Sequence, residues 1–134
     1  MLSGKKVTID AKPPFFLDCT LRDGGYYNAW DFSPDLVHQY IDAVTEAGVD
    51  IIELGLRSLK THGFMGAHAY TTDDYIKSLN LPTSLNISVM VNASELLTGQ
   101  NLEDTLALLF PNSADTSPVS LVRIACHSFV LLKL

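Results

Sequence analysis

The chain has 134 residues, 47% of them hydrophobic and 18% charged, which is typical of a globular domain with a real core rather than of a disordered segment. Its net charge of -6 repels a phosphate backbone and argues against nucleic acid as a partner. No stretch approaches the roughly 20 apolar residues of a membrane helix, and the start of the chain lacks a signal-peptide core, so we predict a cytoplasmic protein with no membrane partner.

Four short apolar runs, rich in residues that favour extended structure, predict β-strands. Capped amphipathic segments between them predict helices. In chain order, the expected elements are strands at 15–19, 49–54, 85–91 and 119–125, and helices at 33–48, from 72 to before Pro82, and at 101–110. This alternation predicts an α/β fold with parallel strands.

The strands start 34, 36 and 34 residues apart. This spacing is the length of a βα unit, in which the helix returns the chain for the next parallel strand. Four such units make either a small open sheet or half of a barrel, and the spacing alone does not separate the two. In both cases the active site is expected at the carboxyl ends of the strands.

The first predicted strand is followed by Arg22, Asp23, Gly24 and Gly25. Arg22 offers a planar set of donors for a carboxylate or an enolate oxygen, and Asp23 offers a hard oxygen ligand for a divalent cation. The two glycines allow a sharp turn or a close approach of the backbone to a ligand. The alternative is an Arg–Asp pair that only stabilises a loop.

The second predicted strand carries Glu53, which points to the side opposite Leu54. A carboxylate inside a sheet must be paired, and Arg22 on the neighbouring strand is its natural partner. The alternative is a purely structural ion pair. His62 and His68, which follow this strand, do not have the spacing of a zinc site and are interpreted as loop histidines.

Three further polar residues lie on the last two strands or at their carboxyl ends. Asn92 is either a hydrogen-bonding group for substrate or a helix cap. Arg123 lies inside an apolar strand and needs a partner such as an acidic residue across the sheet. His127 is either a base or substrate contact, or an ordinary surface residue.

These residues resemble a known family. The runs L-D-C-T-L-R-D-G-G at 17–25 and I-I-E-L-G at 51–55 resemble the pyruvate carboxyltransferase-like (DRE-TIM) metallolyases. That family includes hydroxymethylglutaryl-CoA lyase, isopropylmalate and homocitrate synthases, and 4-hydroxy-2-oxovalerate aldolase. The longer run from 18 to 32 resembles the branch whose members are assigned as aldolases by similarity. The likeness extends from about Phe15 to His127.

The resemblance implies a (β/α)8 TIM barrel and a divalent metal, Mg²⁺, Mn²⁺ or similar, that chelates a 2-oxo or hydroxy acid and stabilises an enolate. It implies that Asp23 is a metal ligand, that Arg22 stabilises the enolate oxygen and that Glu53 orients Arg22. In the same family, V-R-x-A often occupies the fourth strand, as residues 122–125 with Arg123 do here. In the oxovalerate aldolases a His follows two residues on, and His127 stands at that position.

Two features depart from the family pattern. Tyr26 stands where Gln or His is usual, which makes Tyr26 or Tyr27 the candidate general acid or base. The chain also lacks the His-x-His that supplies the family's other metal ligands, and 134 residues are about half of the roughly 250 that such a barrel needs.

We therefore expect an extension at 1–14, the first half of a barrel at 15–127 and an atypical apolar tail at 128–134. The predicted function is that of a carbon–carbon lyase or aldolase acting on a 2-oxo acid or its aldol adduct, incomplete in this chain alone. Half of a barrel leaves sheet edges open, so self-association is also expected. The alternatives are a non-catalytic module that binds a partner or an anionic metabolite through Arg22, Arg57 and Arg123, and an independent four-unit domain that binds a small ligand without metal.

Overall fold

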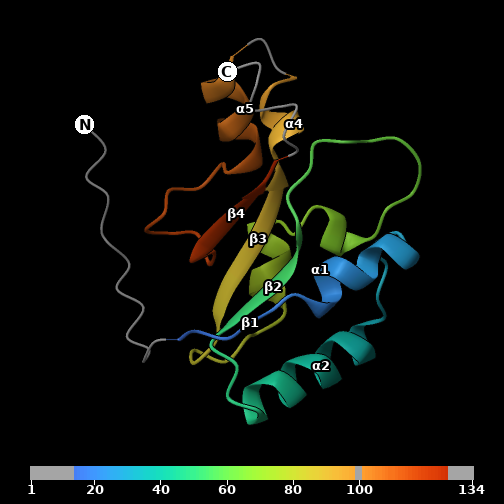
Figure 1. Cartoon of the computed structure of the whole chain (residues 1–134), viewed down its shortest axis with the longest axis vertical. Coiled ribbons are helices and arrows are strands. Elements are labelled where there is room, and N and C mark those ends of the chain that lie inside the picture. The colour runs from blue at the N-terminus through green and yellow to red at the C-terminus, as the bar shows by residue number, and fades with distance from the viewer. Residues whose placement is uncertain (1–13, 99–100, 127–134) are drawn as a thin grey trace.

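The protein is described by a computed structural model that covers residues 14–98 and 101–126. Four parallel strands form one sheet in the order β1-β2-β3-β4 (Figure 1). The strands are β1 (Leu17–Asp18), β2 (Ile51–Leu56), β3 (Asn86–Asn92) and β4 (Leu121–Ala125). The predicted α/β fold with sequential parallel strands is confirmed, and four strands in this order are consistent with part of a TIM barrel.

Three helices form where the sequence predicted them: α2 (Pro34–Glu46), α3 (Asp73–Ser78) and α5 (Leu102–Leu109). Each begins at a polar cap, because the side chains of Ser33, Thr72 and Asn101 accept hydrogen bonds from backbone N–H groups of the first turn. After α2 the chain turns at Gly48, whose φ of 72° is a conformation that glycine adopts without strain.

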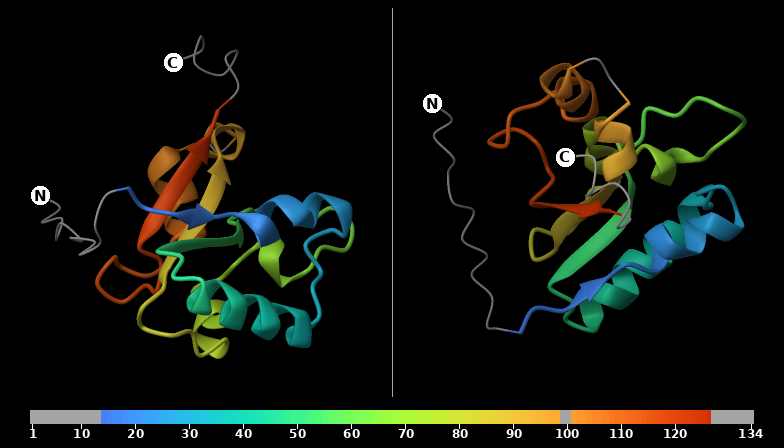
Figure 2. Two further views of the ribbon diagram at one scale, coloured as in Figure 1. Left: turned by 60° about the horizontal axis from the view of Figure 1, so that its bottom comes forward. Right: turned by 45° about the horizontal axis from the view of Figure 1, so that its top comes forward.

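The core lies between the sheet and the helices α2 and α3. Ile52, Leu54 and Ile87 of the sheet cluster with apolar residues of α2 and α3, which include Val37 and Ile76. Figure 2 shows α2 running along this side of the strands. Because side chains alternate along a strand, Glu53 and Ser88 are directed to the other face of the sheet. None of the helices in the described part of the chain has the length and hydrophobicity of a membrane span.

The segment after β1 differs from the sequence prediction. We expected Gly24 and Gly25 to allow either a sharp turn or a close approach of the backbone to a ligand, but the chain continues as a short helix, α1 (Thr20–Gly24), and a 3-10 turn, η1 (Gly25–Tyr27). Both glycines have helical φ values, near −60°. Their role is therefore not a turn. Two further short elements, η2 (Ala67–Ala69) and α4 (Ala93–Leu96), follow β2 and β3.

Candidate functional site

The junction between β1 and α1 is fixed by Asp18. Its carboxylate accepts a hydrogen bond from the hydroxyl of Tyr40 (2.6 Å) and two from Thr20, one from the backbone N–H and one from the hydroxyl. Burial alone would raise the pKa of Asp18, but these hydrogen bonds outweigh it and hold the pKa below its usual value. Asp18 therefore ties α2 to the start of α1 and sets where the next residues, Arg22 and Asp23, project.

Glu53 is the centre of the site. Its carboxylate is fully buried and accepts hydrogen bonds from two arginines. Arg22 donates through Nε to Oε1 (2.8 Å), and Arg123 donates through Nε to Oε2 (2.6 Å) and through Nη2 to Oε1 (2.8 Å). The hydroxyl of Ser88 adds a longer bond to Oε2 (3.3 Å). The predicted pairing of Arg22 with Glu53 is confirmed, and Glu53 is also the acidic partner that Arg123 was expected to need.

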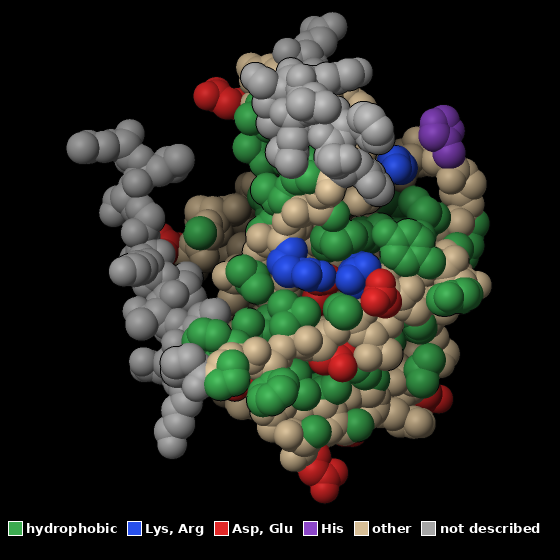
Figure 3. Space-filling view, viewed as in Figure 1, with side chains coloured by type: hydrophobic (Ala, Val, Ile, Leu, Met, Phe, Trp, Pro, Cys, Tyr) green, Lys and Arg blue, Asp and Glu red, His purple; other side chains and the backbone are tan. Residues whose placement is uncertain are grey.

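The three charged groups stabilise one another's ionised forms. Burial alone would raise the pKa of Glu53, but the hydrogen bonds from Arg123 and Arg22 outweigh it and the pKa lies below its usual value. Burial alone would lower the pKa of Arg22, but the bond to Glu53 and the charge of Asp23 outweigh it and the pKa is raised. Figure 3 shows basic side chains in contact with acidic ones near the centre of this face.

The two arginines keep donors that point away from Glu53. Nη2 of Arg22 and Nη1 of Arg123 have no hydrogen-bond partner among the described residues. The side chain of Arg22 is 11% exposed and that of Arg123 is 44% exposed. A planar guanidinium held on one side by a carboxylate presents its remaining N–H groups in a fixed direction. The site thus offers preorganised donors for an anionic oxygen.

Asp23 lies beside these donors and is 64% exposed at its side chain. Its Oδ1 accepts from Nη1 of Arg22 (2.6 Å), and the thiol of Cys19 lies 3.8 Å from Oδ2. A carboxylate in this position is accessible to a cation. However, the described residues contain no group of three His, Cys, Asp or Glu side chains that could hold a metal ion. Residues 14–98 and 101–126 therefore do not by themselves make a metal site, although Asp23 has the right chemistry for one ligand.

The loop after β2 is anchored by His68, which the sequence placed in an ordinary loop. The register between β2 and β3 shifts between Glu53 and Gly55, which leaves Leu54 out of the pairing. The ring of His68 is buried, with Nδ1 2.6 Å from the carbonyl oxygen of Leu54 and Nε2 2.8 Å from the hydroxyl of Tyr75. Since a carbonyl only accepts, Nδ1 carries the proton and Nε2 accepts from Tyr75. Burial lowers the pKa of His68, so the ring is a neutral structural group.

Tyr26, the candidate acid or base, lies in η1, is exposed and lines the same surface hollow as Asp23. Its ring packs edge-on against Trp30 at 4.7 Å between centroids. Trp30 in turn donates from Nε1 to the backbone carbonyl of Arg22 (2.9 Å). A Cβ on Gly25 would lie 1.9 Å from the Trp30 ring, which explains why glycine follows Gly24 here. The indole thus supports the segment that carries the site.

Asn92 is the last residue of β3 and stands at the N-cap position of α4, but its side chain makes no capping hydrogen bond. This favours a free amide over the helix-cap alternative. His127, the remaining predicted site residue, lies outside the described residues.

The structure thus brings Arg22, Asp23, Glu53 and Arg123 together, and Tyr26 lines the same surface hollow as Asp23.

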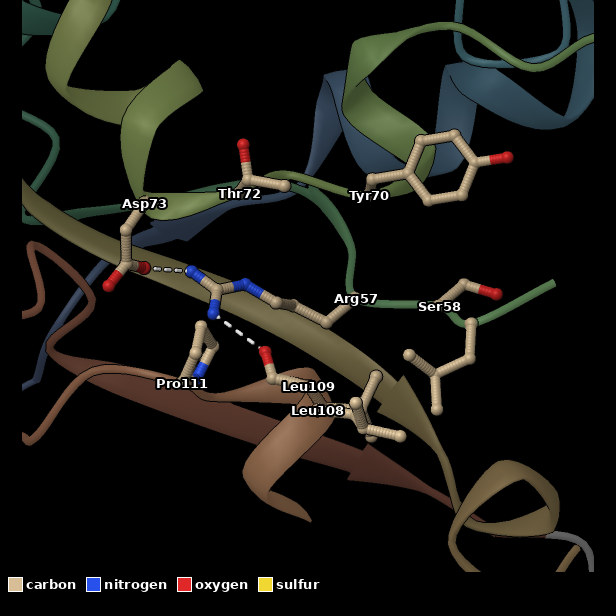
Figure 4. Close-up of a pocket in the computed structure, with 9 residues that line it drawn as sticks. Arg57, Ser58, Tyr70, Thr72, Asp73, Leu108, Leu109 and Pro111 are labelled. Atoms are coloured by element: carbon tan, nitrogen blue, oxygen red, sulfur yellow. Dashed lines mark hydrogen bonds and ion pairs between the residues drawn. The ribbon is translucent and has the colours of Figure 1, made fainter. Parts of the chain in front are cut away.

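Arg57 does not join this group. It is buried after β2, where it forms an ion pair with Asp73 and donates to the carbonyl of Leu109 (Figure 4). It also donates to the carbonyl of Thr71. Its guanidinium also lies 5.0 Å from the centroid of the Phe110 ring. The cavity of about 230 Å³ in Figure 4 is therefore lined by charges that are already satisfied. Arg57 holds helices together and is not available for an anion.

Glu95 is a buried residue that the sequence analysis missed. It lies in α4, and its carboxylate accepts from the hydroxyl of Ser58 and from the backbone N–H of Leu59, both at 2.8 Å. These bonds fix the loop after β2 against α4. The signal available in the sequence was an acidic residue in the first turn after a strand, which is more often a favourable helix-dipole residue than a buried anchor.

No protein-family model matches the chain, and no curated protein matches it. Among solved structures, the chain is similar to one described as the N-terminal domain of a "putative aldolase" from Bacteroides vulgatus. The two share 34% sequence identity with a TM-score of 0.61, over 82% of this chain and 34% of that chain.

This likeness supports an aldolase-like α/β fold. The chain spans about a third of the length of the neighbour it matches. The shared part takes in most of this chain, so the sheet and its helices are a recurring arrangement and not peculiar to one sequence.

Proposed function

We propose that this chain supplies part of the active site of an aldolase-type carbon–carbon lyase that acts on a 2-oxo acid or its aldol adduct. The observation that carries the proposal is Arg22, clamped by the buried carboxylate of Glu53 while its remaining donors point outward beside the exposed Asp23. The likeness to a domain described as that of a putative aldolase supports the same class of reaction.

The chemistry needs an anion-stabilising group at a defined place. In cleavage of a 4-hydroxy-2-oxo acid, a base removes the proton of the C4 hydroxyl and the C3–C4 bond breaks. The bonding electrons move into the C2–C3 bond and leave negative charge on the C2 oxygen, while C4 departs as an aldehyde. Protonation at C3 then gives the 2-oxo acid. Arg22 is placed to donate to the C2 oxygen as its charge develops.

Other residues take the remaining tasks in this proposal. The outward donors of Arg123 suit the substrate carboxylate. Tyr26, which lines the same surface hollow as Asp23, is the candidate that exchanges a proton with the substrate through its hydroxyl. Asp23 is proposed as one ligand of a divalent cation whose other ligands come from outside the described residues. Such a cation, when bound, would polarise the substrate oxygen as a Lewis acid.

The proposal is tested by enolisation, because the methyl protons of pyruvate exchange with solvent only through the enolate. The chain is incubated with pyruvate and Mg²⁺ in heavy water, and deuterium uptake at C3 is followed by NMR. We expect uptake above the buffer rate, and a loss of about a hundredfold in Arg22→Lys, since the ammonium lacks the planar set of donors. No uptake by the unaltered chain overturns the proposal for this chain.

Asp23→Asn tests the cation ligand, with Asp42→Asn on the exposed face of α2 as the matched control. Affinity for Mn²⁺ and uptake of deuterium should both fall in Asp23→Asn and stay unchanged in Asp42→Asn. Equal values in the two variants would show that Asp23 is not a ligand.

A binding module without catalysis is the second candidate. It is favoured by one observation, the absence of a three-ligand group among the described residues. It would use the outward donors of Arg22 and Arg123 for an anionic metabolite, without Arg57. Saturable binding of oxalate that Arg123→Ala abolishes, with no deuterium uptake, distinguishes this function from the lyase.

A further inference from the structure

A small cavity lies next to the proposed catalytic residues, at the carboxyl ends of β2 and β3. Leu56, the last residue of β2, and Asn92, the last residue of β3, both line it. Tyr26 forms another part of the wall and also lines the shallow hollow around Asp23. Tyr26 is thus common to the walls of the cavity and of the hollow around Asp23.

The wall is largely apolar, with few free polar groups. Trp30, Leu56 and Met65 supply the apolar surface. The carboxylate of Glu95 also borders the cavity, but Ser58 and Leu59 already occupy both of its oxygens. The amide of Asn92, in contrast, makes no hydrogen bond within the described residues. Lys60 also lines the cavity, so the polar groups left for an occupant are the Lys60 ammonium and the Asn92 amide.

The volume of the cavity limits what it can hold. It measures about 150 Å³. A dry apolar cavity of about that size accommodates a benzene molecule. The occupant thus has about six non-hydrogen atoms, a mainly apolar body and a polar end that Asn92 or Lys60 can contact.

We infer that this cavity is the subsite for the aldehyde side of the aldol adduct, and that the aldehyde is short and mainly aliphatic. The inference rests on the proposed function. The 2-oxo acid end binds at Arg22 and Asp23, the reacting carbons lie beside Tyr26, and the remaining substituent extends into the cavity. The size of the chamber makes Met65 and Leu56 the residues that set the length of the accepted chain, and Asn92 the residue that orients it.

Trp30 makes the test direct, because it is the only tryptophan of the chain and lines the cavity. Pentanol, an unreactive analogue of a short aldehyde, is titrated into the 134-residue chain while the tryptophan emission is recorded. We expect a saturable change with a dissociation constant on the order of millimolar, as for other fragments of this size. Glycerol has the same number of non-hydrogen atoms but is polar throughout, and adamantanemethanol is too bulky, so neither should saturate.

Two variants locate the binding. Met65→Phe narrows the chamber and should weaken pentanol binding about tenfold or more. Leu108→Phe is its matched control, since Leu108 lines the separate cavity beside Arg57 and should leave binding unchanged. Asn92→Ala should weaken binding about threefold to tenfold, through loss of one hydrogen bond. NMR shifts of the backbone amides of residues 56, 65 and 92 on addition of pentanol provide a readout that needs no substitution.

The outcomes separate this inference from the proposed function. Pyruvate exchange without saturable pentanol binding, or pentanol shifts that map elsewhere, overturns the subsite and leaves the lyase in place. Pentanol binding at these residues without any exchange overturns the lyase, and with it the assignment of the fragment to an aldehyde. Both signals together, with loss of pentanol binding in Met65→Phe, support the subsite.

Discussion

The guanidinium of Arg123 meets the carboxylate of Glu53 from two strands away, although 70 residues separate them in sequence. Nε of Arg123 lies 2.6 Å from Oε2 of Glu53, and β3 lies between the two strands that carry them. The residue of β3 at this place is Ser88, whose short side chain leaves room for the arginine and donates to the same oxygen. One buried carboxylate thus links three strands and α1.

The first prediction concerns the charge of Glu53. Glu53→Gln leaves Arg123 without a counter-charge and Arg22 with only the exposed Asp23. We expect a loss of stability of about 3 kcal/mol, the lower end for a broken buried pair, because Arg123 is half-exposed. Urea unfolding followed by circular dichroism measures the loss. Glu46→Gln, on the exposed end of α2, is the matched control and should change stability by no more than about 0.5 kcal/mol.

The same variant has a pH signature. The pKa of Glu53 in the folded chain is below its ordinary value of 4.5. The contribution of ionised Glu53 to the free energy of unfolding is therefore fully present above about pH 4.5 and is lost as pH falls through the folded pKa. The stability difference between the unaltered chain and Glu53→Gln should therefore narrow in acid. If the stability difference between the two proteins stays constant down to the pH at which the chain unfolds in acid, the ionised carboxylate of Glu53 is not the cause of that difference.

The second prediction concerns His68, whose pKa is lowered by burial from an ordinary value of 6.5. Below about pH 6.5 the unfolded chain takes up a proton at this ring and the folded chain does not, so stability falls as pH falls. The slope from this one group reaches at most about 1.4 kcal/mol per pH unit. His68→Gln should remove it. Urea unfolding between about pH 7 and about pH 5 gives the slope of the unfolding free energy against pH for the unaltered chain and for His68→Gln. Equal slopes in the two proteins would show that His68 has the same pKa in the folded and the unfolded chain.

The strands, the helices α2, α3 and α5, and the ion pair between Arg22 and Glu53 could be predicted from the sequence, because their signals are local or follow from strand order. Apolar runs and polar caps mark elements directly. Consecutive parallel strands are neighbours, so Arg22 after the first strand and Glu53 on the second were expected to meet. The residue type alone showed that Arg123 needed an acidic partner, but the register that selects Glu53 is a tertiary property.

The contacts of the loop after β2 could not be predicted in this way. The bulge at Leu54 frees a carbonyl for His68, and no residue in the sequence marks it. Gly55 fits beneath the His68 backbone, where a Cβ would lie 1.9 Å from the carbonyl oxygen. The burial of Glu95 depends on the path of this same loop. Each of these facts follows from how segments pack, and a single sequence carries no periodic signal for that.

The third prediction concerns the outer edge of β4, which pairs with no other strand in the described part of the chain. Val122 and Ile124 on this strand are exposed. An open edge with apolar side chains promotes association, so the chain should dimerise or aggregate at concentrations on the order of tens of micromolar. Ile124→Lys should shift sedimentation toward the monomer, and Leu36→Lys on α2 should not. A clean monomer of the unaltered chain at these concentrations would contradict the prediction.

The fourth prediction separates the two adjacent glycines of the R-D-G-G run. Both have helical φ, but a Cβ on Gly24 would meet its nearest atom at 3.9 Å, and a Cβ on Gly25 would lie 1.9 Å from Cδ1 of Trp30. Gly24→Ala should therefore leave the packing unchanged and stabilise the short helix by up to about 1 kcal/mol. Gly25→Ala should displace the indole, break its hydrogen bond to the Arg22 carbonyl and cost about 1–3 kcal/mol.

Tryptophan emission distinguishes this cause from a general loss of stability, because the displaced indole of Gly25→Ala should emit at longer wavelength in the folded state. Gly24→Ala should keep the emission of the unaltered chain. Since Trp30 supports the segment that carries Arg22, the same displacement should reduce deuterium uptake by pyruvate in Gly25→Ala alone. If both alanine variants show the same emission and the same stability, Gly25 has no packing role, and the close approach of Trp30 to this backbone does not position the site.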